Sequence, residues 1–139
     1  MRKVLATGTF EILHPGHLAY LKKARELGDE LIVIIARDSM IKHKRKPVIP
    51  EKQRLAMVRA LKIVDKALLG STKDIFEPVK NIKPDFIVLG HDQQFDEDAL
   101  TAELRKRGLM AQVVRIEYVN TSPLCSSAKI IKKIIDKSK

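Results

Sequence analysis

The chain has no tryptophan, a single cysteine and no long uninterrupted run of apolar residues. With Cys125 alone, an internal disulfide is impossible and a zinc site built from cysteines is excluded. No stretch approaches the roughly 20 apolar residues of a membrane-spanning helix. The first nine residues lead into a strand-like segment and not into the apolar region of a signal peptide. We therefore expect a cytoplasmic protein with no membrane partner.

Aromatic residues make up only 4% of the chain, whereas Lys and Arg outnumber Asp and Glu by 27 to 17. The net charge of +10 attracts polyanions such as nucleotides, nucleic acid or anionic lipid, and it does not choose among them. Few aromatics leave few stacking platforms for single-stranded nucleic acid. We expect no nucleic-acid partner, although the basic charge keeps a non-catalytic nucleic-acid-binding domain as an alternative.

The 139 residues have the length of one domain, so we expect a single domain over residues 1–139. Short β-branched runs alternate with amphipathic stretches, which is typical of β-α units that build a parallel sheet. The pattern predicts strands at 3–7, 30–36, 67–69, 85–90 and 111–116, and helices at 15–27, 51–62, 74–81, 98–107 and from about Ser127. It therefore predicts an α/β protein: a Rossmann-like, doubly wound domain with a five-stranded parallel sheet flanked by helices.

Three further expectations concern helix caps, one loop and the last helix. Gly28 and Gly108 stand where helices need a C-terminal cap, and the lysine-rich segment 38–50 reads as a mobile loop. Four isoleucines of the last helix form one apolar stripe against a lysine face, so we expect this helix to dock on the sheet. The stripe consists of Ile130, Ile131, Ile134 and Ile135.

In a doubly wound sheet, ligands bind beyond the carboxyl ends of the strands, and the motif His14-Pro15-Gly16-His17 falls there. Free N–H groups and the positive dipole end of a helix N-terminus favour an anion. Two imidazoles three residues apart lie on one side of a helix and can donate hydrogen bonds to phosphate oxygens. The motif therefore indicates transfer chemistry at a phosphate.

Two other interpretations of this motif remain open at this point. His14 and His17 can be a helix cap and a surface residue at a proline-initiated helix, or they can ligate a metal ion. The metal interpretation is weakened because only His43 and His91 are further histidines and no cysteine lies near the turn in the sequence. Neither GxGxxG after the first strand nor GxxxxGK[ST] is present, which disfavours hydride transfer and P-loop chemistry.

The string GTFEILHPGH resembles the GTF…HxGH signature of the nucleotidyltransferases related to glycerol-3-phosphate cytidylyltransferase. The likeness continues through LGDELIVIIARD, EKQR, IVD, VLGHDQ and SSAKI, and so covers nearly the whole chain. It implies that His14 and His17 contact the nucleotide triphosphate, that Thr9 contacts a phosphate, and that the loop residues Lys44 and Lys46 clamp phosphates. We expect these two histidines and two lysines to be catalytic.

Further residues at the same edge are expected to bind the nucleotide. Gly90 allows the backbone to pass close to the base, while Ser126 and Ser127 cap the last helix or donate to a phosphate. Arg54 either reaches a substrate or is an exposed helical arginine. Asp38 and Asp92 contact the ribose or the base, or they ligate a metal ion. Glu11 ligates the metal or orients a basic neighbour. The expected nucleotide-binding set is Thr7, Gly8, Thr9, Phe10, Gly16, Asp38, Arg54, Gly90, Asp92, Ser126 and Ser127.

Within that family the chain departs from the cytidylyltransferase branch in two places. The RTEGIST segment is absent, and residues 120–127 read NTSPLCSS, while Lys62 stands for an arginine before the third strand. The motif HPGH, the string GHDQ with Phe95 after it, and the end PLCSSAKI look instead like the archaeal FAD synthetases. This resemblance implies that FMN attacks the α-phosphate of ATP in line and yields FAD and pyrophosphate.

A CTP-dependent transferase, such as a glycerol-3-phosphate cytidylyltransferase, remains the alternative, because the histidine turn says little about the base. A phosphate monoester is already largely dianionic near neutral pH, since its second pKa is about 6, so no general base is required. We expect Mg²⁺ as the divalent cofactor, with ligands that the sequence does not assign. An exposed sheet edge would allow a homodimer.

Overall fold

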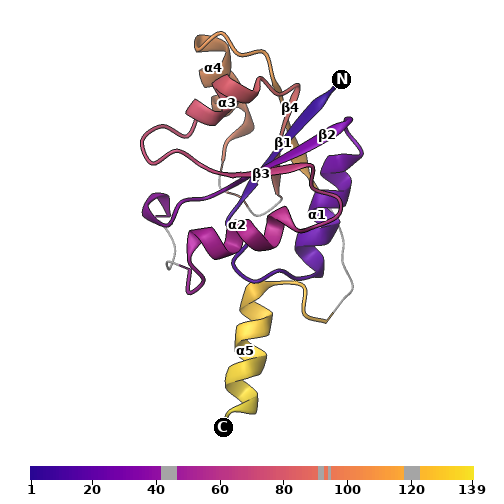
Figure 1. Ribbon diagram of the computed structural model, residues 1–139, viewed down its shortest axis with the longest axis vertical. Coiled ribbons are helices and arrows are strands. Elements are labelled where there is room, and N and C mark those ends of the chain that lie inside the picture. The colour runs from indigo at the N-terminus through magenta and orange to yellow at the C-terminus, as the bar shows by residue number, and fades with distance from the viewer. Residues whose placement is uncertain (42–46, 91–92, 94, 118–122) are drawn as a thin grey trace.

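The computed structural model describes residues 1–41, 47–90, 93, 95–117 and 123–139. Within these residues the strands form one parallel sheet of five, in the order β3-β2-β1-β4-β5 (Figure 1). The strands are β1 (Lys3–Gly8), β2 (Glu30–Ile35), β3 (Lys66–Leu69), β4 (Phe86–Gly90) and β5 (Gln112–Ile116). The predicted fold class and parallel sheet are confirmed, and each strand begins and ends within one residue of its predicted bounds.

Helices cover both faces of the sheet. Successive residues of a central strand point to opposite faces, so each central strand contributes side chains to both layers. Val4 and Ala6 of β1 pack in the layer of α1 and α2, whereas Leu5 packs in the layer of α3 and α4. Residues 31–35 of β2 are buried throughout, as expected for a strand covered on both sides. The helices are α1 (Pro15–Arg25), the short 3-10 helix η1 (Asp38–Met40), α2 (Glu51–Arg59), α3 (Glu77–Ile82), α4 (Glu97–Lys106) and α5 (Ser127–Lys137).

The two predicted glycine caps have different outcomes. Gly108 adopts a left-handed φ of 77° after α4, which confirms its role as a helix terminator. The prediction for Gly28 is wrong, because α1 already ends at Arg25 and is capped by Glu26 in a right-handed conformation. A Cβ atom at Gly28 would lie 2.8 Å from the Arg2 carbonyl oxygen. This glycine is therefore required for a close approach of two chain segments.

The last helix begins at Ser127 as predicted, but its expected docking on the sheet is wrong. No residue of α5 is buried, and Ile134 and Ile135 are 62% and 49% exposed. Figure 1 shows the helix projecting away from the sheet and its flanking helices. The physical reason is that α1 with α2 and α3 with α4 already cover the two faces, so neither face is left for a further helix. Among the described residues, no helix is long and apolar enough to cross a membrane.

We expect the double substitution of Ile134→Asn and Ile135→Asn to change the free energy of unfolding by less than about 1 kcal/mol, because both side chains are exposed. Urea denaturation checks this, with Leu104→Ala as a control. Leu104 is fully buried between α4 and the sheet, and its truncation should cost about 2–5 kcal/mol. A loss in the isoleucine variant as large as in the control would show that α5 packs on the domain after all.

Candidate active site

The two histidines meet at the turn between β1 and α1. His14 is the N-cap of α1, and its Nδ1 accepts the N–H of Gly16 at 3.1 Å. The Nδ1 of His17 accepts the N–H of His14 at 3.3 Å, and the two rings stack with centroids 3.7 Å apart. A neutral imidazole that accepts through Nδ1 carries its proton on Nε2. The cap therefore uses Nδ1 of each ring, and a neutral ring in this position carries its N–H on Nε2.

Phe10 packs against His17 of this pair. Its side chain is buried, its backbone has a left-handed φ of 53°, and its ring centroid lies 5.0 Å from that of His17. A Cβ atom at Gly8 would lie 2.6 Å from the Phe10 ring, so a side chain at position 8 would displace it. Gly8 thus leaves room for the Phe10 ring, which holds His17 in place. Both residues belong to the predicted nucleotide-binding set, and the structure places them next to the histidine pair.

The N-termini of α1 and α5 lie next to each other. A Cβ atom at Gly16 would meet the carbonyl oxygen of Cys125 at 2.6 Å, so this close approach requires glycine. Ser126 follows directly and is the N-cap of α5, its Oγ accepting the N–H of Lys129 at 3.2 Å. Each helix N-terminus carries N–H groups without partners inside the helix and a positive dipole end. Together they make this edge of the sheet attractive to a phosphate chain.

A buried guanidinium joins the turn after β1 to both ends of the connection between β2 and α2. Arg54 is only 1% exposed, so its interpretation as an exposed helical arginine is wrong. It donates to the carbonyls of Thr9 at 2.7 Å and Ile49 at 3.0 Å, and to Oδ1 of Asp38 at 2.5 Å. These partners belong to the loop after β1, the segment before α2 and the start of η1. Arg54 therefore determines how the loops at the carboxyl edge lie relative to one another.

Asp38 and Glu51 brace the same loops by a reciprocal pair of hydrogen bonds. The N–H of Asp38 donates to Oε1 of Glu51 at 2.9 Å, and the N–H of Glu51 donates to Oδ2 of Asp38 at 3.2 Å. Arg37 donates to Oε2 of Glu51 at 2.7 Å and to the Gly70 carbonyl after β3 at 2.7 Å. The Asp38 N–H and the Arg37 guanidinium together hold the pKa of Glu51 below its ordinary value.

On the other side of β1, Gln93 joins the ends of β1 and β4. Its side-chain oxygen accepts the N–H of Gly90 at 2.7 Å, and its amide nitrogen lies 3.4 Å from Oγ1 of Thr7. Arg115 of β5 donates to the carbonyls of Gly90 at 2.7 Å and Phe95 at 2.5 Å, and it pairs with Glu97. Gly90 and Thr7, both predicted, are thus neighbours at the sheet edge.

The structure brings most of the predicted site residues to one edge, apart from three that lie outside the described residues. Those three are Lys44, Lys46 and Asp92. The bracing residues Arg37, Glu51, Gln93 and Arg115 were not predicted. The sequence around Glu51 indicates only that a helix starts after Pro50. Nothing in the local sequence distinguishes Arg37 or Arg115 from a surface arginine.

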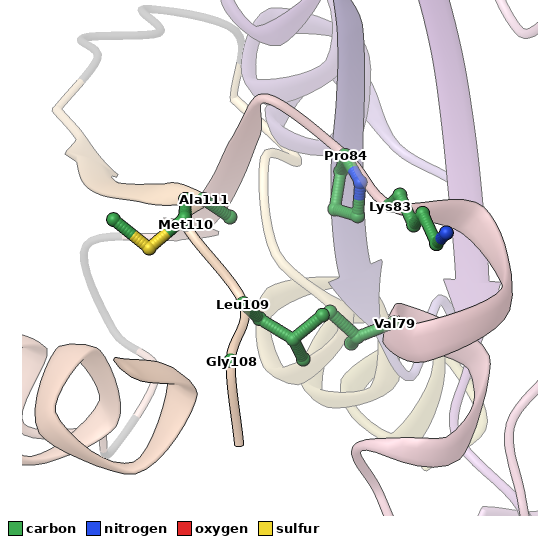
Figure 2. Close-up of a pocket in the computed structure, with 7 residues that line it drawn as sticks. All are labelled: Val79, Lys83, Pro84, Gly108, Leu109, Met110 and Ala111. Carbon is green, nitrogen blue, oxygen red and sulfur yellow. The ribbon is translucent and has the colours of Figure 1, made fainter. Parts of the chain in front are cut away.

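A pocket of about 290 Å³ lies at the opposite edge of the sheet (Figure 2). Lys83 and Pro84 precede β4, and Met110 and Ala111 precede β5, so the pocket opens at the amino ends of these strands. Neither His14 nor His17 lines this pocket.

In the part of the chain that the structure describes, no group of three or more His, Cys, Asp or Glu residues is placed to hold a metal ion. The candidate active site is the carboxyl edge, because it carries the stacked histidine pair and the adjacent N-termini of α1 and α5.

Comparisons with known proteins identify the family of the chain. Residues 5–133 match the cytidylyltransferase-like family. The chain is 62% identical over 135 residues to the FAD synthase of Methanothrix thermoacetophila, covering 97% of this chain and 94% of that one. It is 59% identical over 133 residues to the FAD synthase of Archaeoglobus fulgidus, covering 96% and 97%.

Two solved structures share the fold. One is described as a lipopolysaccharide core biosynthesis protein from Thermoplasma volcanium, with a TM-score of 0.83 and 45% identity over 86% of this chain and 99% of that one. The other, a protein of unknown function from Archaeoglobus fulgidus, has a TM-score of 0.71 and 18% identity over 86% and 93%. At that identity the second likeness supports the fold alone.

We expect Glu51→Gln to reduce the acid sensitivity of the fold. Because the folded pKa of Glu51 lies below its ordinary value of 4.5, its ionised form stabilises the protein above that value. This contribution is lost as the pH falls through the folded pKa. Urea denaturation from about pH 7 to about pH 3 should show the wild-type advantage over the variant shrinking toward low pH.

The control for this experiment is Asp136→Asn, which removes an exposed carboxylate of α5. Its difference from the wild type should be small at every pH, because an exposed charge contributes little. A wild-type advantage over Glu51→Gln that stays constant across the acid range would contradict the role given to the Glu51 charge.

Proposed function

The chain belongs to the cytidylyltransferase-like family, and from that premise we propose that it is an FMN adenylyltransferase, which makes FAD and pyrophosphate from FMN and ATP. The observation that carries the proposal is the stacked pair His14 and His17 at the N-terminus of α1, beside the N-terminus of α5. The relatives named FAD synthase, close to 60% identical over nearly the whole chain, support the choice of FMN and ATP as substrates.

The reaction is a single in-line displacement. An oxygen of the FMN phosphate forms a bond to the α-phosphorus of ATP, and the bond from that phosphorus to the oxygen bridging to the β-phosphate breaks. The bonding electrons leave with pyrophosphate. The attacking phosphate is largely dianionic near neutral pH, since its second pKa is about 6, so the protein supplies no base. Its task is to hold two polyanions in line and to stabilise the charge of the transition state.

Each histidine has a defined part in this task. Nδ1 is engaged by a backbone N–H, so the ring cannot turn without losing a helix cap, and Nε2 donates in a fixed direction. Such preorganised donors stabilise the charge on the phosphate oxygens at little cost of reorganisation. The N–H groups at the start of α1 and α5 add to this stabilisation.

The remaining assignments complete the proposal. Thr9, Gly90, Ser126 and Ser127 contact the nucleotide, and Lys44 and Lys46 clamp its phosphates. Arg54 serves as a positioning residue, since its three donor nitrogens are engaged by Thr9, Asp38 and Ile49.

ATP enters as its magnesium complex, because Mg²⁺ is usually held through substrate phosphates with one or two carboxylates and several waters. Bound in this way, Mg²⁺ would neutralise part of the phosphate charge. Pairing of the edge strands β3 or β5 between two copies would give a homodimer.

Cytidylyl transfer is the second candidate, because the family takes its description from that reaction. We expect the purified protein to form FAD and pyrophosphate from FMN and Mg-ATP, and to form little product from CTP and glycerol 3-phosphate. Chromatography after incubation with each nucleotide and each acceptor, alone and in pairs, identifies the products. Efficient formation of CDP-glycerol would overturn the flavin assignment and leave the displacement mechanism standing.

We expect His14→Ala and His17→Ala to lower turnover by roughly a hundredfold, because each removes a donor aimed at transition-state charge. His14→Asn separates this role from the helix cap. Asn is a good N-cap and can accept the Gly16 N–H, but it has no Nε2. The Asn variant should unfold at the wild-type temperature and still lose most of its turnover. Near-normal turnover in His14→Asn and His17→Ala would show that the histidines only begin the helix.

A further inference from the structure

A groove of about 270 Å³ lies between the turn after β1 and helix α2. The turn contributes Phe10, Ile12 and Leu13, which lead directly to His14. The facing side is formed by Ile49, just before α2, and by Gln53 and Met57 of α2. The groove is therefore an apolar extension of the candidate active site, with one amide side chain on its wall.

The charged groups of this groove are already engaged. Arg54 donates to Thr9, Asp38 and Ile49, and Oε2 of Glu11 accepts the N–H of Val48 at 2.5 Å. Among the described residues that line the groove, Arg54 is the only cation, so a phosphate gains little there. A flat aromatic ring system gains more, since apolar side chains contact its faces and the Gln53 amide can pair with polar atoms on its edge.

The position of the groove relative to the histidines indicates which substrate it serves. In the strand order β3-β2-β1-β4-β5, Ile49 and Met57 lie in the connection between β2 and β3, whereas Gly90 follows β4 on the other side of β1. In-line displacement places the attacking and leaving oxygens on opposite sides of the α-phosphorus. The leaving oxygen belongs to pyrophosphate, so this requirement does not fix the side of the nucleoside. With the nucleoside proposed at Gly90, on the β4 side of β1, the groove on the β2 side is the space beside the histidine turn that is left for the acceptor.

We propose that this groove binds the isoalloxazine ring of FMN and directs the FMN phosphate toward the α-phosphorus of ATP. This inference rests on the proposed function, and it assigns the ring to residues that have no part in holding phosphate. The thioether of Met57, whose residue is 55% exposed, packs against the ring. Gln53 contacts the polar edge of the ring.

The test uses Met57→Ala and Gln53→Ala, with Met110→Ala as the matched control. Met110 is 76% exposed and lines the pocket at the opposite edge of the sheet (Figure 2), so the control removes the same side chain away from the active site. Quenching of flavin fluorescence without ATP gives the Kd for FMN. Steady-state kinetics give the KM for FMN and for Mg-ATP separately, and riboflavin as a competitor reports recognition of the ring without its phosphate.

We expect Met57→Ala to raise the Kd and KM for FMN roughly five- to tenfold, since it removes an apolar contact at a ligand surface. Gln53→Ala should act in the same direction. Riboflavin should compete less well in both variants, while the KM for ATP changes by less than about twofold. Met110→Ala should match the wild type in every measurement.

The alternative outcomes separate this inference from the proposed function. If the wild type binds FMN and forms FAD but both groove variants keep its Kd and KM for FMN, the groove assignment is wrong and the proposed function stands. A raised KM for ATP with unchanged FMN binding would assign the groove to the nucleotide and overturn the inference. A wild type that neither binds FMN nor forms FAD would overturn both.

Discussion

The carboxyl edge of the sheet depends on the buried guanidinium of Arg54. A charge that is removed from water is tolerated only when it is paired and hydrogen-bonded, and here the acceptors are Thr9, Ile49 and Asp38. These residues come from loops on different strands, so Arg54 is satisfied only when the loops take their native positions. Removal of any of these acceptors leaves a buried donor unsatisfied, which couples the geometry of the site to the stability of the fold.

The parts of the structure that were predictable follow from local pattern. Continuous apolar runs identified the buried strands, and the positive φ of Gly108 follows from its place after α4. The histidine turn was predictable because both rings belong to one short motif. The partners of Arg54 and the position of α5 depend on contacts between distant segments, which no local pattern reports. The apolar stripe of α5 predicted docking, but it could not show that other helices already cover both faces of the sheet.

The two sides of β1 carry different contacts. On the side of β2 and α2, the Arg54 and Glu51 contacts support an apolar groove next to the histidines. On the side of β4 and β5, Gln93 and Arg115 are hydrogen-bonded to Gly90 at the end of β4. The histidine pair at the end of the central strand lies between the two. In the proposed arrangement FMN reaches the α-phosphorus of ATP from the β2 side while the nucleoside lies on the β4 side, and the cap of α1 by His14 holds the histidine pair between them.

In the proposed reaction an oxygen of the FMN phosphate attacks the α-phosphorus of ATP at this edge. Heavy-oxygen labelling tests it most directly. FMN labelled in the non-bridging oxygens of its phosphate is converted with unlabelled ATP, and both products are examined by mass spectrometry. We expect all of the label to be retained in FAD, including the oxygen that bridges its two phosphorus atoms, and pyrophosphate to carry none. Label in pyrophosphate or in inorganic phosphate would contradict it.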